Sequence, residues 1–214
     1  MDLEEKQRKL KEIAKRVEGC KKCPLWKNPK AVPGEGNPEA EVMLTGEAPG
    51  YYESVQGRPF VGAAGQLLTQ LLKSIGLERT QVFICNMLRH RPPENRDPLP
   101  QEIEACAPFL DKQIEIIDPR IIVTLGRFSL SKFLPGEYIS KIHGQARFVD
   151  FAGKKRIIIP MYHPAAALRS SIIMEEIKKD FQKIVQFLER NKELLETQAV
   201  KDEDKNESDQ MSLI

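Results

Sequence analysis

The sequence predicts an α/β fold in which a parallel sheet is covered by helices on both faces. Short apolar runs of strand length alternate along the chain with longer segments of helical periodicity. The strand-like runs are apolar almost throughout, as strands buried on both faces are. Strands separated by helices need crossover connections, which produce a parallel sheet. The 214 residues suffice for one domain with a buried core.

The expected strands are apolar runs that end in turn or polar residues. Four are predicted, at residues 41–46, 81–86, 120–126 and 156–164. The segment QARFVDFAGKKRIII, which leads into the fourth, predicts a local antiparallel hairpin that turns at Gly153.

The expected helices precede, separate and follow these strands. The N-terminal segment MDLEEKQRKLKEIAKRVEG is charged throughout and predicts an amphipathic helix, not a signal peptide. AGQLLTQLLKSIG predicts a second helix with its leucines on one face. LPQEIEACAPFLDKQIEII predicts a third, weakened by Pro108, and RFSLSKFL follows the third strand. An amphipathic helix at 174–191 closes a single domain, 1–191, and the polar residues 192–214 predict a disordered tail.

Composition excludes little. Apolar residues make up 41% of the chain and charged residues 30%, and the net charge of +2 neither indicates nor excludes a nucleic-acid partner. No apolar run approaches the roughly 18 residues needed to cross a membrane. Because no export signal is present, we expect a cytoplasmic protein in a reducing compartment, where disulfides are rare.

Polar signatures follow three of the four predicted strands. GEAPG follows the first, Asn86 and a proline-rich loop the second, and His163 the fourth. Singly, each has a plain structural explanation: Glu47 in a solvated turn, Asn86 at a strand end, His163 as a hydrogen-bonded histidine and Phe60 as a core aromatic. Ligands of open parallel sheets bind beyond the carboxyl ends of the strands. The shared location therefore predicts one functional site.

The four cysteines suggest a metal centre. Cys20 and Cys23 have the C-x2-C spacing of a metal-binding pair, whereas Cys85 and Cys106 lie far away in the sequence, beside the expected site. Zinc favours a second closely spaced pair, which this chain lacks. An iron–sulfur cluster tolerates scattered ligands. The pattern favours a cluster over zinc and both over a disulfide, although Cys85, in mid-strand, also fits a buried free thiol.

Several motifs together resemble the family 4 uracil-DNA glycosylases, thermostable iron–sulfur enzymes of archaea and some bacteria. The motifs are GEAPG, GRPFVGAAGQLL, NMLRHRPPENRDP followed by EIEAC, and HPAAALR, in this order between about Cys20 and Asn191. The resemblance implies a three-layer α/β/α fold with a central four-stranded parallel sheet. It also implies hydrolysis of the N-glycosidic bond of deoxyuridine in DNA, which leaves an abasic site in base excision repair.

The resemblance also implies roles for particular residues. Phe60 would stack on the extruded uracil, Asn86 would bind its Watson–Crick edge beside Gly46 and Ala48, and His163 would contact O2. Glu47 and Asn95 are the candidates for placing the attacking water. Arg169 would touch DNA phosphates, and the small residues of HPAAALR, with Pro164 and Ala165, would fill the gap left by the flipped base.

A [4Fe-4S] cluster is implied as well, but its third ligand departs from the family. The family carries a cysteine immediately before RPP, where this chain has His90, and Cys85 lies five residues earlier. The count of four cysteines favours Cys85, and the unchanged spacing to Cys106 favours His90. We expect Cys20, Cys23, Cys85 and Cys106 to bind the cluster.

Two alternatives stay open. A relative that traps uracil covalently would need an inserted histidine-bearing loop after the second strand, and RHRPPENRDP looks like the ordinary loop. A non-catalytic iron–sulfur module for electron transfer or DNA binding would require the strand-end residues to be incidental. Uracil-containing DNA is the expected partner of a monomer, and QMSLI at the C-terminus faintly resembles a sliding-clamp-binding peptide without its aromatic pair.

Overall fold

A computed structural model describes residues 1–27 and 30–189 of the chain. Its centre is a sheet with the strand order β1-β3-β2-β4-β6-β5. Four neighbouring strands are parallel: β3 (Phe83–Asn86), β2 (Val42–Gly46), β4 (Ile121–Leu125) and β6 (Lys154–Met161). These are the four strands that the sequence predicts.

The sheet is wider than the expected four strands, because an antiparallel strand is added at each edge. β5 (Arg147–Phe151) pairs with β6 through a tight turn at Ala152 and Gly153, whose φ angles are 53° and 73°. Positive φ at both turn residues suits the right-handed twist of a hairpin, so the predicted hairpin is confirmed. At the other edge, β1 (Glu35–Gly36) pairs with β3. A strand of two residues has no readable periodicity, and the sequence did not predict it.

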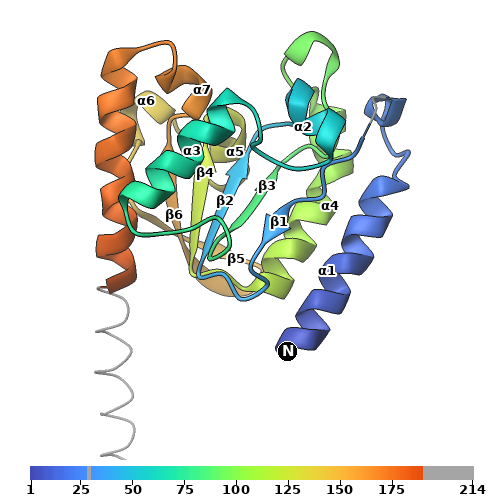
Figure 1. Ribbon diagram of the computed structural model, residues 1–214. Coiled ribbons are helices and arrows are strands. Elements are labelled where there is room, and N and C mark those ends of the chain that lie inside the picture. Colours follow the sequence, from blue (N-terminus) through green and yellow to red (C-terminus); the bar gives the residue numbers. More distant parts are fainter. Residues whose placement is uncertain (28–29, 190–214) are drawn as a thin grey trace, which may run out of the picture.

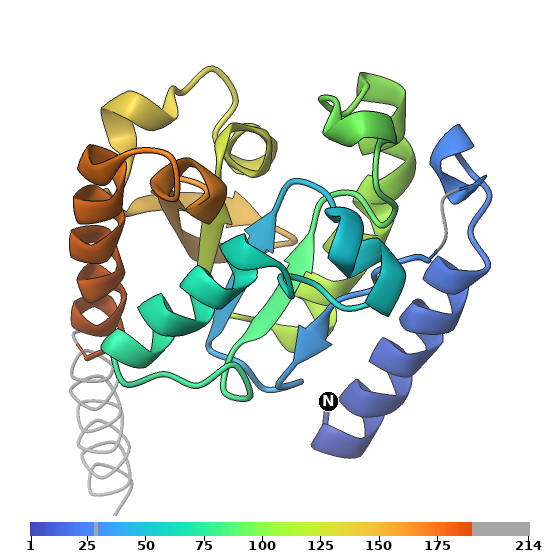
Figure 2. The same cartoon turned by 45° about the horizontal axis from the view of Figure 1, so that its top comes forward.

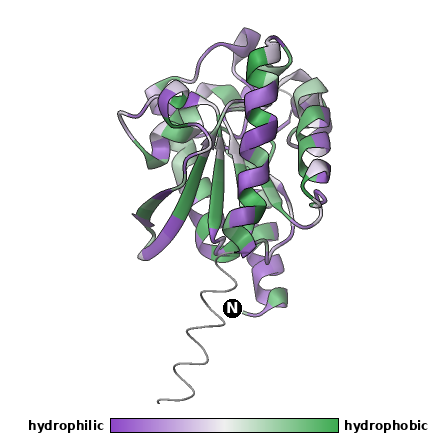
Figure 3. Ribbon diagram, turned by 90° about the vertical axis from the view of Figure 1, so that its left-hand side faces the viewer, coloured by the Kyte–Doolittle hydropathy of each residue, from purple (hydrophilic) through white to green (hydrophobic). Residues whose placement is uncertain are grey.

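Helices cover both faces of the sheet, as three layers require (Figure 1). On one face lie α3 (Ala63–Ser74), α7 (Pro164–Ala167) and a helix over residues 171–189. On the other face lie α4 (Pro100–Ile117) and α5 (Arg127–Phe133). In Figure 3 the central strands are green, whereas the covering helices carry both green and purple residues. The predicted fold class is therefore confirmed.

The remaining helices lie outside these layers or at the ends of the sheet. α1 (Leu3–Glu18) packs on α4, with Ile13 and Val17 against Phe109 and Ile116. The short helices are η1 (Pro24–Lys27), α2 (Tyr51–Gln56), η2 (Pro93–Asn95) and α6 (Ile139–Ile142). α2, α7 and η2 surround the carboxyl ends of the parallel strands (Figure 2).

The predicted third helix is confirmed as α4, and Pro108 lies inside it without interrupting it. A proline deprives the carbonyl four residues earlier of its hydrogen bond. Both Pro108 and the residue four positions earlier, Glu104, are exposed, so water can bind the freed carbonyl. The helix continues because its apolar face remains packed on the sheet.

Two further expectations concern the ends and the surroundings of the chain. Within residues 1–27 and 30–189, no helix is both long and apolar enough to cross a lipid bilayer. The predicted tail at 192–214, and with it the QMSLI segment, lies outside the described residues. The domain boundary near residue 191 thus stays a prediction.

Candidate active site

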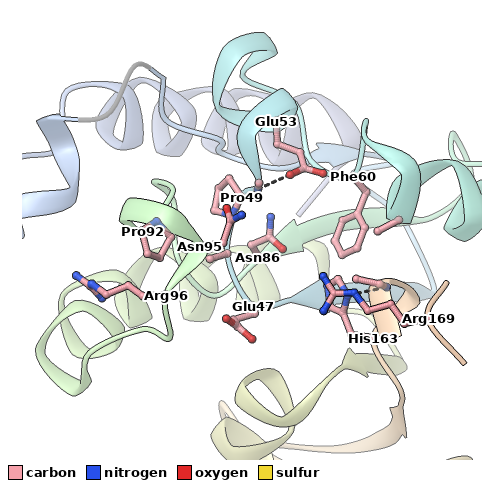
Figure 4. Close-up of a pocket in the computed structure, with 14 residues that line it drawn as sticks. Glu47, Pro49, Glu53, Phe60, Asn86, Pro92, Asn95, Arg96, His163 and Arg169 are labelled. Atoms are coloured by element: carbon pink, nitrogen blue, oxygen red, sulfur yellow. Dashed lines mark hydrogen bonds between the residues drawn. The ribbon is translucent and has the colours of Figure 1, made fainter. Parts of the chain in front are cut away.

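A cavity of about 410 Å³ opens at the carboxyl ends of the parallel strands. Figure 4 shows side chains from several separate segments pointing into it. Of the residues that the sequence singled out, the cavity brings together Glu47, Ala48, Phe60, Asn86, Asn95, His163, Ala165 and Arg169. Its size lies in the usual range for small-ligand sites.

Gly46 does not itself line the cavity, but two of the lining side chains approach its backbone closely. It ends β2 and pairs in register with Asn86 at the end of β3. A methyl group on Gly46 would lie 2.4 Å from Oδ1 of Asn86 and 2.6 Å from Cζ of Phe60. The close approach of ring and amide therefore requires glycine at this position.

Phe60 and His163 form one wall of the cavity. Their ring centroids are 5.7 Å apart and their planes differ by 27°. Phe60 is only 5% exposed and belongs to the core cluster beneath α3, so its position is fixed from behind. An aromatic face at the edge of such a cavity can hold a flat, unsaturated ring.

Asn86 presents an amide to the same space. The residue is 2% exposed, and within the described part of the chain its side chain makes no hydrogen bond. The backbone around it is held, since Met87 N–H donates to Gly46 O at 3.0 Å and Leu88 N–H to Glu47 O at 2.9 Å. A fixed amide with a free donor and a free acceptor suits recognition of a complementary edge.

His163 is a neutral imidazole of defined tautomer. Ala165 N–H donates to Nδ1 of His163 at 3.1 Å, at the start of α7. Burial lowers the pKa of His163 to about 4, so the ring carries no charge at neutral pH. Because Nδ1 accepts, Nε2 must carry the proton, and His163 is a hydrogen-bond donor at Nε2.

Glu47 lies on the opposite side of the cavity from Phe60 (Figure 4). Burial raises the pKa of its carboxyl, the negative charge of Asp97 raises it further, and Arg127 opposes both. Arg127 also forms an ion pair with Asp97 at 2.5 Å. Glu47 is therefore a carboxylate whose basicity exceeds that of an exposed glutamate.

Asn95 stands at the mouth of the cavity, on a backbone with φ of 54°. Its Oδ1 accepts a hydrogen bond from Nε of Arg91 at 2.8 Å. The acceptor of the amide is thus engaged, and the NH₂ group can donate to a ligand. Asn95 and Glu47 consequently offer different groups, a donor and an acceptor.

Glu53 and Arg96 also line the cavity, although the sequence did not single them out as site residues. Glu53 accepts a hydrogen bond from the N–H of Gly50 and so closes the GEAPG turn. Arg96 binds both carboxylate oxygens of Glu102, at 2.6 and 2.9 Å. The position of Glu53, three residues after Gly50, is typical of a glutamate that caps the start of a helix, and it could have been recognised in the sequence. The pairing of Arg96 was not, because it depends on how the loop folds back onto α4.

The predicted DNA-contacting residues separate into two kinds. Arg169 and Ala165 line the cavity, and Arg169 is exposed. Pro164 is buried at the first position of α7, where a proline suits the start of a helix, and it does not line the cavity. The neighbouring Leu168 is 50% exposed. The exposed end of this segment is therefore at Leu168 and Arg169.

Three of the cysteines form a group beside the cavity. Burial raises the pKa of Cys23, and Cys20 and Cys106 also influence it. Burial likewise raises the pKa of Cys106 to about 11, with contributions from Cys23 and Cys20. Cys106 and Cys23 share an apolar cluster with Leu25 and Leu88. Segments far apart in the sequence, residues 20–25 and α4, thus bring three thiols together.

Cys85 stands apart from this group. It is fully buried, in the apolar cluster formed with Met43, Phe83 and residues of α4 on one face of the sheet. The side chains that influence its pKa, which burial raises, are Arg89 and Thr45, not the other cysteines. His90 is 5% exposed and follows Arg89, whose backbone N–H is a hydrogen-bond partner of Cys106. The structure does not bring Cys85 to the other three cysteines.

The donor set of the three-cysteine group suits an iron–sulfur cluster. Within the described residues, no three histidine, cysteine, aspartate or glutamate side chains lie close enough to bind one metal ion. A cluster does not need such a group, because its irons take separate thiolate ligands. Three thiols from two segments, residues 20–25 and α4, next to apolar residues that exclude water, are the ligands that a cluster prefers.

Comparison with known proteins agrees with this geometry. The sequence profile of the uracil DNA glycosylase superfamily matches residues 33–189, which include every strand of the described sheet. The chain therefore belongs to the uracil-DNA glycosylase superfamily, and its similarity to curated proteins places it with the type-4 members.

Three relatives illustrate this similarity, and each is named type-4 uracil-DNA glycosylase. The chain is 52% identical to the protein of Sulfurisphaera tokodaii over 182 residues, covering 82% of this chain and 83% of the relative. It is 49% identical to that of Saccharolobus solfataricus, with 82% and 85% covered. It is 46% identical to that of Archaeoglobus fulgidus, with 82% and 91% covered.

Proposed function

We propose that this protein is a DNA repair enzyme that removes uracil from DNA and leaves an abasic site. The observation that carries the proposal is the convergence of Phe60, Asn86, Glu47 and His163 on one cavity at the carboxyl ends of the strands. The names of the relatives at 46–52% identity support it. Such an enzyme must rotate the nucleotide out of the duplex before reaction, because the glycosidic bond is inaccessible in the stack.

The cavity supplies recognition of the base. Phe60 offers a ring face on which uracil stacks, and the Asn86 amide offers a donor and an acceptor for its Watson–Crick edge. Cytosine presents the opposite donor and acceptor at the corresponding positions, so a fixed amide rejects it. Gly46 leaves the room in which the base reaches both groups.

The bond is broken by stabilising the charges that develop. The C1′–N1 bond breaks with its electron pair moving to uracil, whose O2 gains negative charge. His163 donates from Nε2 to this oxygen, and it does so as a neutral group. The sugar gains positive charge, which the Glu47 carboxylate stabilises. A neutral hydrogen-bond donor and a carboxylate thus face the reacting bond.

Water completes the reaction at C1′. We assign Glu47 as the group that accepts the proton of water while its oxygen adds to C1′, since burial raises the pKa of this carboxyl. Asn95 helps to orient the water with its NH₂ group, since Arg91 engages its Oδ1. Arg169 binds a phosphate of the DNA, and Ala165, Pro164 and Leu168 belong to the segment next to the gap left by the base.

We further propose that Cys20, Cys23 and Cys106 bind a [4Fe-4S] cluster. For the remaining ligand the arrangement favours His90 over Cys85, since His90 follows the residue whose backbone contacts Cys106. A bound cluster would join residues 20–23 to α4, and no step of the reaction above passes through it. We propose a monomer that acts on DNA in the cytoplasm, and binding to a sliding clamp through residues 210–214 stays a prediction.

A uracil-release assay tests the function. A labelled oligonucleotide with a single deoxyuridine, single-stranded or paired with guanine or adenine, is incubated with the protein and then cleaved with alkali at abasic sites. We expect cleavage by the wild type and severe loss in His163→Ala and Asn86→Ala. Intact DNA under every condition, with binding retained, would instead favour a non-catalytic DNA-binding module. A protein–DNA adduct that survives denaturation would indicate covalent trapping.

A further inference from the structure

Phe60 has an unusual backbone conformation. Its φ is 52°, in the left-handed region that bulky L residues rarely adopt. The ring nevertheless belongs to the buried core and forms one wall of the cavity. A residue held in a disfavoured conformation needs contacts that prevent it from relaxing.

One guanidinium provides such contacts. Nη2 of Arg79 donates to the carbonyl oxygen of Pro59 at 2.9 Å, and Nη1 donates to that of Phe60 at 3.2 Å. Arg79 lies between α3 and β3, away from the cavity lining, and its side chain is 20% exposed. Its planar fork thus holds two successive carbonyls, which fixes the peptide between them.

Helix α3 confines the same carbonyl from another direction. A methyl group on Gly65 would lie 1.8 Å from the carbonyl oxygen of Phe60 and 2.0 Å from its carbon. The first turn of α3 therefore packs directly against the backbone of Phe60. The carbonyl is held between this turn and Arg79.

A carboxylate keeps the guanidinium in place. Oε1 of Glu35, on the edge strand β1, accepts from Nη2 of Arg79 at 2.9 Å. Arg58 binds the same carboxylate at 2.7 and 3.1 Å and is far more exposed, at 60% of its side chain. Burial alone would raise the pKa of Glu35, but hydrogen bonds from Arg58 and Arg79 lower it below its usual value. Glu35 is thus a carboxylate at neutral pH.

We propose that Arg79 is a positioning residue, which locks Phe60 in the conformation that presents its ring to the flipped base. The inference rests on the proposed role of Phe60 as the stacking surface for uracil. Without Arg79, two carbonyls lose their donor and the backbone of Phe60 can leave the left-handed region. The ring would then occupy the stacking position for only part of the time, and capture of the base would weaken.

The test compares two arginines that share Glu35. Arg79→Met removes the contacts to the carbonyls, whereas the matched control Arg58→Met removes a salt bridge to Glu35 without touching them. We expect kcat/KM for uracil release to fall about tenfold in Arg79→Met, a part of the stacking contribution of one base. Arg58→Met should stay within about twofold of the wild type, as expected for an exposed ion pair.

A double-mutant cycle shows whether Arg79 acts through Phe60. Phe60→Ala alone is expected to lose roughly ten- to a hundredfold. In the Phe60→Ala background, adding Arg79→Met should change kcat/KM by less than about twofold, because no ring remains to be positioned. Binding to DNA that carries 2′-fluoro-2′-deoxyuridine, which resists cleavage, should show the same pattern.

Arg79→Lys guards against a purely structural failure. Lysine keeps the positive charge beside Glu35 but lacks the planar fork that binds two carbonyls, so this variant should fold like the wild type and still lose activity. Wild-type activity in Arg79→Lys or Arg79→Met would overturn the proposal. The proposal would also be overturned if Arg79→Met lowered kcat/KM as much in the Phe60→Ala background as it does in the wild type. A failure of the proposed function is distinct, because the wild type itself would then release no uracil, whereas a fully active Phe60→Ala would show that Phe60 is not the stacking surface.

Discussion

The N–H of Ala165 donates to Nδ1 of His163 over 3.1 Å, so one imidazole both begins a helix and serves the cavity. The bond defines the tautomer of the ring, since a nitrogen that accepts from a backbone N–H carries no proton. The proposed contact to uracil O2 therefore depends on a backbone hydrogen bond two residues further along the chain. Protonation of Nδ1 would break that bond.

His163 is expected to stay neutral well below its usual pKa. Burial lowers its pKa to about 4, against an ordinary value of 6.5. Nitrogen-15 NMR of the imidazole should show the Nε2-protonated tautomer between pH 5 and pH 8. The unfolded chain binds a proton near 6.5 and the folded one does not, so this residue makes stability fall as the pH drops from 6.5 toward 4. His163→Gln should lack that component in denaturant unfolding, and an imidazolium signal at pH 6 would contradict the assignment.

Glu47 is expected to determine the acid limb of the pH–rate profile for uracil release. Burial and Asp97 raise its pKa above the ordinary 4.5, and the reaction needs the carboxylate, so uracil release should slow as the pH falls through this raised value. Asp97→Asn removes a like charge and should move the limb to lower pH. Glu47→Gln should lower the single-turnover rate at least about a hundredfold and abolish the limb. An unchanged limb in Glu47→Gln would assign it to another group.

Asn86→Ala tests recognition of the base. The change removes the donor and acceptor that face the cavity and leaves the edge of uracil unpaired, so kcat/KM should fall roughly ten- to a hundredfold. Asn37→Ala is the matched control, because Asn37 makes its contacts at Val82 and Glu39, at the amino end of β3. Equal losses in both variants, measured by uracil release, would show that the effect is one of folding and not of recognition.

Gly46→Ala tests the close packing of Asn86 and Phe60 against the Gly46 backbone. The added methyl group would collide with Oδ1 of Asn86 and Cζ of Phe60, so both groups must shift. A displacement of this size should lower kcat about a hundredfold. Gly19→Ala is the control, because a methyl group there meets nothing closer than 3.6 Å. Activity retained in Gly46→Ala, by the same assay, would contradict the packing described here.

Iron and sulfide analysis tests the cluster ligands. Alanine at Cys20, Cys23 or Cys106 should remove most of the iron and the absorbance near ~400 nm, because each supplies a thiolate. Cys85→Ala should keep both, whereas His90→Ala should lose iron and His90→Cys should retain it. The reverse pattern at residues 85 and 90 would show that Cys85 is the ligand. A colourless wild-type protein that contains zinc would exclude the cluster.

Much of the fold was predictable because its strands and helices are long enough to show their periodicity. The four parallel strands and the helix at α3 are apolar in patterns that extend over at least four residues. β1 was missed since two residues carry no pattern. The sequence did not show that the helix continues through Pro108, because this depends on whether water reaches the freed carbonyl, and exposure is a property of the folded protein.

The site was predictable where its residues end strands, and not where it depends on long-range packing. Gly46 and Asn86 were expected together, and the register of β2 and β3 pairs them. The contacts of Arg79 with Phe60 join residues 19 positions apart, one before and one after helix α3, and no sequence pattern links the two. Likewise, Cys85 packs in an apolar cluster with Leu110 and Ile114 of α4, whereas Cys106 packs with Leu25 and Leu88, and the position of Cys85 beside the loop did not reveal this separation.

The packing of α1 has a consequence for how the protein unfolds. This helix rests on α4 through a small apolar contact outside the two main layers, and Cys20 and Cys23 come directly after it. A cluster bound to these cysteines and to Cys106 would close a long loop of the chain, and such a tie restricts the denatured ensemble more than it strengthens any native contact. A bound cluster would then stabilise the amino-terminal segment against unfolding on heating. Without it, α1 would detach from α4 at a lower temperature than that at which the sheet unfolds.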